Sequence, residues 1–418
     1  MAAAAKARGL EVVVVNRSPL PHSGPFRVPD GLVDELFPVD SWSDEEQIRA
    51  VLDEICARYE IAGSYAAFEG ALPFDAELRE RVGLPTSGAA VIRDALDKGA
   101  VRSRLHGAGL SRLGSTDLAT ALGWESWGFP GPAILKPVHG TGSALCFTVS
   151  SLPELRAAAE EIGRATLAGG VTRDYVLGRA AAFVLEQKAE GELLSVESLV
   201  FGGEVRVVGL MGRYVLAADP VVEQGTIFPY QHPRYAEIAE AAVAFHRFLG
   251  ITHGPTHLEV MVPEEGPIEL IDFNLRAAGV AATVTFGLAH DIRYQELLTD
   301  LGCGLAPDTS ALGRNVRWTA ECLVLPRPGT TELRDISFPD TARFVRVTKE
   351  LGKPLSGRSD QLDAVAMFVV TAGTPEQLHR AVLDARRRTV VNGEPLGDNP
   401  NNDLTAPRQL RTLQGVPA

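Results

Sequence analysis

The sequence predicts a mixed fold, α/β at its N-terminus and α+β in the remainder of the chain. Helix-like and strand-like segments alternate over residues 1–95, which is the pattern of a small parallel sheet. Strand-like segments follow one another over 183–219 and 255–279, which favours antiparallel pairing. A further set of strands with one helix begins near residue 305. We therefore expect three folded units: residues 1–95, 96–304 and 305–400.

The first unit contains a buried strand in "VVVV" (12–15), an amphipathic helix in 44–59, a strand and loop in 61–70, and a short helix in 75–84. The chain opens on a helix-like segment, "AAAAKARG". A doubly wound, Rossmann-like domain normally begins with a strand. Either this unit lacks the first strand of such a domain, or the start of the chain is misplaced.

The middle unit begins in a predicted helix, 90–110, with Gly109 as its stop. The segments that follow it alternate in type along the chain: strand, glycine turn and strand (132–151), helix (152–170), antiparallel strands around a "GG" turn (183–219), helix (234–251) and a hairpin around "PEEGP" (255–279).

The last unit, 305–400, has three strand-like segments, and its helix starts at Thr374 and Pro375. Residues 401–418 are polar without periodicity, so we expect a flexible tail.

Composition narrows the class of protein. The chain has 418 residues, 45% hydrophobic and 22% charged, which is typical of a water-soluble globular protein. Its net charge of −13 argues against a nucleic-acid partner. No segment approaches the roughly 18 apolar residues of a membrane span. Four scattered cysteines without a CxxC pair argue against zinc and disulfides, so we expect a cytoplasmic protein.

The hairpin at 255–279 carries a candidate metal site. Glu259 lies on its first strand, and Asp272 and Asn274 lie two residues apart on its second. Neighbouring antiparallel strands bring such side chains together on one face. Three oxygen ligands without His or Cys suit Mg²⁺, or Mn²⁺, bound together with substrate phosphates. The alternative interpretation is a solvated sheet face.

A second motif, "KPVHGTGS", is a candidate phosphate site. Lys136 ends a strand, and a glycine-containing loop follows it: His139, Gly140, Thr141, Gly142 and Ser143. Glycines expose backbone N–H groups to phosphate, and lysine adds positive charge. The lysine precedes the glycines, so this is not a P-loop; the alternative is a plain β-turn. The segment 184–192, "VLEQKAEGE", can offer backbone groups to a planar base.

Taken in order, these segments resemble the ATP-grasp superfamily over most of the chain. The segments that carry the resemblance are "DKGAVR" (97–102), "AILKPVHGTGS" (133–143), "VLEQKAEGELLSVESLV" (184–200), "HLEVMV" (257–262) and "ELIDFNLRAAG" (269–279). Within the superfamily the chain looks most similar to L-amino acid ligases of the bacilysin type and to carnosine-synthase-like enzymes. The shared features are "SVESL", "EQGTIFP" (223–229), "THLEV" and "TAGTPEQLHRAV".

The resemblance implies a pre-ATP-grasp domain with a glutamate loop at "AFEG" (67–70), a two-lobed ATP-grasp domain and a β-rich C-terminal domain. It implies binding of ATP and Mg²⁺, with a role for each matched residue. Lys98 and Lys136 would contact the phosphates, the loop 139–143 would close over them, and the adenine would lie against Glu186, Gln187, Lys188 and Ala189. The metal would be bound by Glu259, Asp272 and Asn274.

The resemblance also implies residues that contact the substrate. Arg276 would hold the substrate carboxylate or the acyl-phosphate, and Glu223 would line the substrate pocket. Glu197 would support the site from behind.

The sequence departs from the family pattern at four positions. Asp272 replaces the usual glutamate, and Leu275 replaces the proline before the arginine. Leu193 stands where a glutamate often binds the ribose, and Glu192, one residue earlier, is the candidate for that contact. Thr226 replaces a histidine that is often found three residues after the pocket glutamate. A titratable group is therefore missing beside the reacting amine, which suggests a different acceptor or a different base.

Cys146, His257 and His139 could each have either a structural or a functional role. We expect Cys146 to be a small core residue rather than a nucleophile. His257 is expected to point to the strand face opposite Glu259 and to have a structural role. His139 could reach phosphate.

The leading hypothesis is an ATP-dependent carboxylate–amine ligase that acts on amino acids or other small carboxylates and amines. Another ATP-grasp enzyme, biotin-carboxylase-like or of the purine pathway, is the second. A non-catalytic nucleotide-binding protein is the third, and the retained lysines and metal ligands argue against it. A homodimer is common in the family that the chain resembles.

Overall fold

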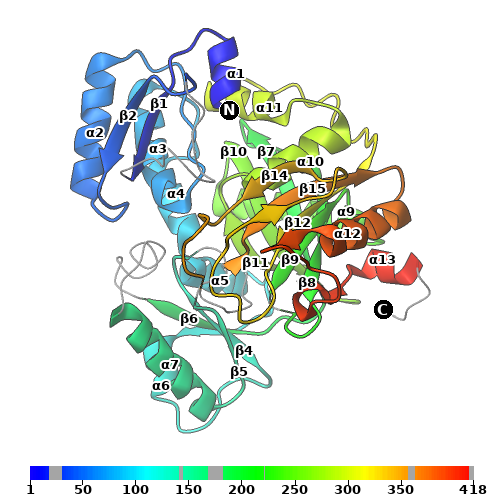
Figure 1. Ribbon diagram of the computed structural model, residues 1–418. Helices are drawn as coiled ribbons and strands as arrows, with labels where there is room; N and C mark the ends of the chain where they lie inside the picture. Colours follow the sequence, from blue (N-terminus) through cyan, green and yellow to red (C-terminus); the bar gives the residue numbers. More distant parts are fainter. Residues whose placement is uncertain (18–30, 141–144, 168–181, 221, 356–362, 414–418) are drawn as a thin grey trace.

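The computed structural model describes residues 1–17, 31–140, 145–167, 182–220, 222–355 and 363–413 (Figure 1). In the N-terminal unit, β1 (Val13–Arg17) and β2 (Glu35–Val39) pair in parallel, as expected. The helices of this unit are α1 (Ala2–Ala7), α2 (Glu45–Arg58), α3 (Leu72–Val82) and α4 (Ala89–Leu96), and a short 3₁₀ helix, η1 (Glu69–Ala71), precedes α3. α2 begins where the Asp44 carboxylate accepts a hydrogen bond from the Gln47 N–H. It buries Ile48, Leu52 and Ile55, one turn apart, against the sheet.

The strand expected in 61–70 is wrong. Residues 60–67 form no strand, and the segment runs instead against the C-terminal end of α11 (Tyr294–Gly302). The Ser64 N–H donates to the Gly302 carbonyl at 3.1 Å, and Arg79 donates to the Ser64 carbonyl at 2.8 Å. These contacts satisfy the backbone without a sheet partner.

The helix expected over 90–110 is divided into α4 and α5 (Lys98–Gly107). Asp97 between them is extended, and its carboxylate caps the second helix by accepting from the Ala100 N–H at 2.8 Å. The break therefore places Lys98 at the first position of α5. This position is what allows its side chain to enter the cavity described below.

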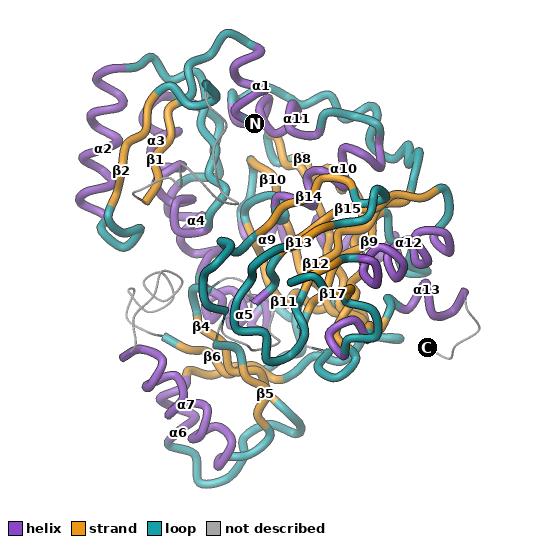
Figure 2. The backbone as a smooth tube through the Cα atoms, viewed as in Figure 1, coloured by secondary structure: helices purple, strands orange, loops and turns teal. Residues whose placement is uncertain are grey.

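The small lobe is a four-stranded antiparallel sheet in the order β3-β6-β4-β5, covered by two helices (Figure 2). Its elements are β3 (Ser115–Asp117), α6 (Leu118–Leu122), β4 (Ala133–Pro137), β5 (Phe147–Val149), α7 (Leu152–Leu167) and β6 (Phe183–Gln187). Leu135, Leu155 and Leu185 form the centre of its core, and each is fully buried.

The large lobe is built on a sheet in the order β11-β10-β7-β8-β9-β12-β15-β14. Its strands are β7 (Glu192–Phe201), β8 (Glu204–Leu216), β9 (Glu223–Phe228), β10 (Gly254–Val262), β11 (Glu269–Asn274), β12 (Trp318–Val324), β14 (Arg343–Val347) and β15 (Ala366–Ala372). The helices α9 (Tyr235–Leu249) and α10 (Val280–His290) pack against it. The strands beyond residue 305 thus continue the same sheet, because β12 pairs with β9 in antiparallel register.

The C-terminal part adds α12 (Pro375–Arg388), which starts at the expected Thr374 cap. A small sheet of β13 (Ile336–Ser337), β16 (Val390–Val391) and β17 (Glu394–Pro395) lies beside it. The flexible tail expected for 401–418 is wrong over its described part, because η3 (Pro400–Asn402), β18 (Leu404–Thr405) and α13 (Arg408–Leu413) are ordered elements. β18 pairs with β8, so backbone pairing fixes a segment whose composition gave no periodic signal. Over the described ranges, no helix is both long and apolar enough to cross a membrane.

Candidate active site

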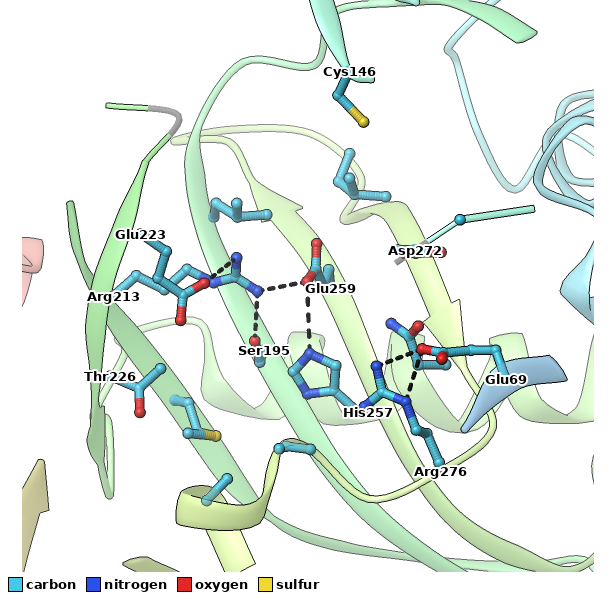
Figure 3. Close-up of a pocket in the computed structure, with 18 of the residues that line it drawn as sticks. Glu69, Cys146, Ser195, Arg213, Glu223, Thr226, His257, Glu259, Asp272 and Arg276 are labelled. Atoms are coloured by element: carbon cyan, nitrogen blue, oxygen red, sulfur yellow. Dashed lines mark hydrogen bonds and ion pairs between the residues drawn. The ribbon is translucent and has the colours of Figure 1, made fainter. Parts of the chain in front are cut away.

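A cavity of about 1730 Å³ lies between the small lobe and the large sheet, and Figure 3 shows its floor. β4 and β6 line it on one side, and strands from β7 to β12 line it on the other. Its volume exceeds the roughly 300–1,000 Å³ of ordinary small-ligand pockets, so it can hold more than one substrate.

The hairpin β10–β11 forms one part of the floor. The register of this hairpin, shifted by a bulge between Glu259 and Val260, places Glu259 directly opposite Asp272 and His257 opposite Asn274. All four side chains line the cavity. Carboxylate and amide oxygens are ligands that Mg²⁺ prefers, so Glu259, Asp272 and Asn274 fit that ion. Within the described ranges, no three or more His, Cys, Asp and Glu residues gather as a metal site of their own.

Both predicted lysines reach the cavity. The Lys98 Nζ lies 2.5 Å from Asp272 Oδ2, and the Lys136 Nζ lies 3.0 Å from Glu186 Oε2 and 3.0 Å from the Ile271 carbonyl. Burial alone would lower the pKa of Lys98, but Asp272 outweighs burial and raises it. The Lys98 ammonium is therefore held in its charged form beside a candidate metal ligand.

The predicted adenine segment, Glu186 to Ala189, also lines the cavity. The N–H groups of Gln187 and Lys188 donate to the carbonyls of Gly114 and Pro132, each at 2.9 Å. These two donors are used within the fold, so a base would have to bind other backbone groups of the segment.

The glycine loop is described only at its ends. Gly140 lines the cavity. His139 does not, and its Nδ1–H donates to the Leu96 carbonyl at 3.2 Å. In the described structure His139 is therefore a contact to the end of α4 rather than a cavity residue. Thr141, Gly142 and Ser143 lie outside the described residues.

The prediction for Glu192 is wrong. Its carboxylate accepts hydrogen bonds from the Tyr230 hydroxyl at 2.5 Å and from the Arg408 N–H at 3.1 Å, and it does not line the cavity. Successive side chains on a strand point to opposite faces, and Leu193 is the one that faces the cavity. Glu192 therefore binds the C-terminal segment from the back of β7.

Arg276 is paired with the N-terminal unit. Its Nε and Nη2 donate to Glu69 Oε1 at 2.7 and 2.5 Å, and its Nη1 donates to the Ala277 carbonyl at 3.0 Å. Burial alone would lower the pKa of Arg276, but Glu69 outweighs it and raises that pKa. The "AFEG" glutamate thus holds the guanidinium that is the candidate group for a substrate carboxylate.

Arg213 on β8 is a residue that the sequence analysis missed. It donates to Ser195 Oγ at 3.0 Å and pairs with Glu223 at 2.9 Å and with Glu259 at 2.8 Å (Figure 3). It stands in "GLMGRYVL", between apolar neighbours on a strand. A charged side chain at such a position needs buried partners, so an arginine among apolar strand residues was the feature of the sequence that could have identified Arg213.

The strand face expected for His257 is also wrong. Residues two apart on a strand share a face, and the His257 Nε2 lies 3.6 Å from Glu259 while its Nδ1 donates to Glu197 at 2.5 Å. Burial would lower the pKa of His257, but the charges of Glu197 and Glu259 raise it to about 10. His257 is therefore a cation at neutral pH.

These cations set the charge of the carboxylates. Burial would raise the pKa of Glu259, but Arg213 and His257 hold it well below its usual range. The pKa of Glu223 is raised by burial, which Arg213 only partly opposes. Glu259 is thus kept ionised, the state that a metal ligand requires.

Cys146 lines the cavity rather than the core, so its expected position is wrong. Burial raises the pKa of its thiol to about 11. At neutral pH it is a thiol and not the thiolate that a nucleophile needs.

Two family models match the chain: an ATP-grasp N-terminal domain over residues 2–86 and an ATP-grasp domain over residues 129–284. The structure is similar to that of an L-amino acid ligase from Bacillus licheniformis, with a TM-score of 0.76 and 20% identity over 93% of this chain and 94% of that one. It is also similar to phosphoribosylglycinamide synthetase from Anaerococcus prevotii, with a TM-score of 0.67 and 13% identity over 93% and 95% of the two chains. Biotin carboxylase from Campylobacter jejuni has a TM-score of 0.66 and 14% identity over 99% and 92%. No curated protein sequence matches this chain.

Proposed function

Because the chain belongs to the ATP-grasp superfamily, we propose that it is an ATP-dependent carboxylate–amine ligase acting on amino acids. The observation that supports this most directly is the cavity floor, where Asp272 faces Glu259 across a hairpin and pairs with Lys98, and where Lys136 lines the same cavity. The fold's similarity to an L-amino acid ligase supports the choice of amino acid substrates. Residues 1–95, 96–304 and 305–400 are the proposed pre-ATP-grasp, ATP-grasp and C-terminal domains.

The proposed reaction has two steps. A substrate carboxylate attacks the γ-phosphate of ATP to form an acyl-phosphate, and an amine then displaces phosphate to leave an amide, ADP and phosphate. Mg²⁺, when bound by Glu259, Asp272 and Asn274, would neutralise charge on the phosphates. Lys98 and Lys136 would bind phosphate oxygens in the cavity.

Binding of metal and phosphate would replace one ion pair of the described structure. Lys98 is paired with Asp272, so a bound cation on the carboxylate and a bound phosphate on the ammonium would each take one partner of that pair. Glu259 would stay ionised throughout, because Arg213 and His257 remain beside it. Arg276 would hold the substrate carboxylate for in-line attack, with Glu69 keeping the guanidinium in place.

The experiment measures phosphate release from ATP and Mg²⁺ with the proteinogenic L-amino acids supplied in pairs. Pair-dependent release and a product whose mass equals the two substrates less one water are expected. Release that needs no amine would indicate a different ATP-grasp reaction, and no release with any pair would argue for a nucleotide-binding protein.

Glu259→Gln is the matching variant, and Glu240→Gln on the exposed face of α9 is its control. E259Q should lower kcat by about 10²–10³-fold, the size of loss seen when one charge-stabilising group is removed from an active site. E240Q should keep the wild-type rate. Wild-type activity of E259Q at ordinary Mg²⁺ would contradict the metal assignment.

A further inference from the structure

One row of side chains crosses the cavity floor from β8 to β12. Thr226 on β9 is paired in register with Arg213 on β8 and with Glu321 on β12. All three side chains line the cavity. Directly opposed residues on antiparallel strands have Cβ atoms about 4.5–5.5 Å apart. Glu321 therefore lies beside Thr226.

A bulge in β9 adds a second carboxylate to this row. The register moves from Tyr214↔Gly225 to Val215↔Glu223, which leaves Gln224 as the extra residue. Glu223 and Thr226 can then both face the cavity. Gly225 permits this, because its φ is 147° and a Cβ there would lie 2.1 Å from the Glu321 carbonyl oxygen.

Glu321 differs from the other carboxylates of the floor in the partners of its side chain. Glu223 and Glu259 are both paired with Arg213, whereas the Glu321 carboxylate has neither a hydrogen bond nor an ion pair within the part of the chain that the structure describes. The Thr226 hydroxyl is likewise without a hydrogen-bond partner among the described residues, and Thr226 is only 7% exposed. Two polar groups without partners side by side in a cavity indicate a polar ligand.

The charges around Glu321 indicate the sign of that ligand. Glu223 on β9 is near enough for its charge to act on Glu321. Arg213 lies beyond Thr226 on β8, and Lys349, after β14, lines the same cavity. β15 contributes Val369 opposite Glu321 and the nearby Met367, both apolar. Burial, and then the negative charge of Glu223, raise the pKa of Glu321 to about 8. A cationic ligand would offset both effects.

We propose that Glu321 is the catalytic residue that binds the attacking substrate as its ammonium ion and removes its proton, while the Thr226 hydroxyl accepts a second hydrogen bond from the same nitrogen. The acceptor substrate is thus a primary amine. This inference rests on the proposed ligase function. It also explains how Thr226 can replace a titratable residue, since the base stands on the neighbouring strand.

The ammonium gives one proton to the Glu321 carboxylate, and the nitrogen lone pair attacks the acyl-phosphate carbonyl. The C–N bond forms, the bond from carbon to the phosphate oxygen breaks, and phosphate leaves with the electron pair. The second proton passes from nitrogen to phosphate, giving amide and hydrogen phosphate. Glu321 returns its proton to solvent when the products leave.

Hydroxylamine separates the two half-reactions, because it is largely neutral at pH 7.5 and traps acyl-phosphates as hydroxamates without a base. The test compares wild type, Glu321→Gln and the exposed control Glu394→Gln, using the amino acid pair with the strongest phosphate release. E321Q should lower kcat/KM for the amine by about 10²–10⁴-fold, the usual contribution of a general base. Its hydroxamate formation should equal that of wild type, and E394Q should match wild type in both assays.

The pH dependence gives a readout that a structural role would not move. The base must be ionised, so wild-type kcat/KM for the amine should rise with pH through the pKa of Glu321, about 8 in the free enzyme. In E321Q this rise should move to the pKa of the amine itself. E321Q should melt no lower than wild type, because it removes a buried carboxylate without a partner. E321D, which retracts the carboxylate by one methylene, should show an intermediate rate.

The outcomes are distinct. Wild-type amide formation by E321Q, or loss of its hydroxamate formation, would overturn the role of Glu321 alone. A wild-type protein that forms no hydroxamate with any amino acid would overturn the proposed function, and this inference with it.

Discussion

Arg213→Met tests whether one guanidinium holds the carboxylates of the cavity floor. Arg213 is only 12% exposed and lies 2.9 Å from Glu223 and 2.8 Å from Glu259. Removing one member of a buried ion pair typically destabilises a protein by about 3–5 kcal/mol, because the remaining charge stays buried. His257 still faces Glu259, so we expect a loss of about 3 kcal/mol, at the lower end of that range.

Urea denaturation at pH 7 measures this loss, and Arg206→Met is the matched control. Arg206 is an exposed residue of the same strand, so its substitution should change stability by no more than about 0.5 kcal/mol. The pKa of Glu259 is lower in the folded protein than in the unfolded one, so its ionised carboxylate stabilises the fold at pH values above the unfolded-state pKa. This stabilisation is lost as the pH falls through the folded-state pKa. The deficit of R213M should therefore shrink on acidification. Equal stability of R213M and R206M at pH 7 would refute the reasoning.

Three further predictions concern single side chains. Lys98→Met should weaken ATP binding by about 10–100-fold in calorimetry, since a hydrogen bond to a charged group contributes about 1.5–3 kcal/mol; unchanged affinity would remove Lys98 from the phosphate site. Glu192→Ala should leave the KM for ATP unchanged and lower stability to urea by about 1–3 kcal/mol, because the donors of Tyr230 and Arg408 lose their acceptor; a raised KM would restore Glu192 to the nucleotide site. Folding raises the pKa of His257 from 6.5 to about 10, so the protonated imidazole stabilises the fold. This stabilisation is complete below pH 6.5 and is lost as the pH rises toward 10. The stability difference between wild type and His257→Gln should therefore decrease over that interval, and a constant difference would contradict a protonated His257.

Much of the floor could be predicted from local pattern. The turn "PEEGP" between two apolar strands predicts the hairpin, and with it the closeness of Glu259 and Asp272. Their direct pairing could not be predicted, because a bulge between Glu259 and Val260 shifts the register by one residue and brings Asp272 rather than Ile271 opposite Glu259. Lys98 could be placed near them only through the family resemblance, because the break at Asp97 that directs it into the cavity interrupts an otherwise continuous helical pattern.

The rest depends on which strands become neighbours. Arg213 and Glu321 join the site because β8, β9 and β12 are adjacent in the sheet, and this order is not encoded in any one segment. The bulge that lets Glu223 and Thr226 share a face is equally invisible in a regular alternation. The error for Glu192 is local. Neighbouring residues of a strand point to opposite faces, so placing the ribose contact one residue away assigned it to the wrong face of β7.

The continuity of the large sheet has a consequence for how this protein can be altered. β12, from beyond residue 305, covers the edge of β9 and carries Glu321 into the cavity. The C-terminal part is therefore not an interchangeable module: a chain shortened before β12 would expose an unpaired sheet edge, a hazard for aggregation. Exchange of the C-terminal part between homologues would replace one wall of the cavity. It would also replace β12, one of the two strands that pair at the β9–β12 interface. Point substitutions along β9 and β12 are the less disruptive way to change which amine the protein accepts.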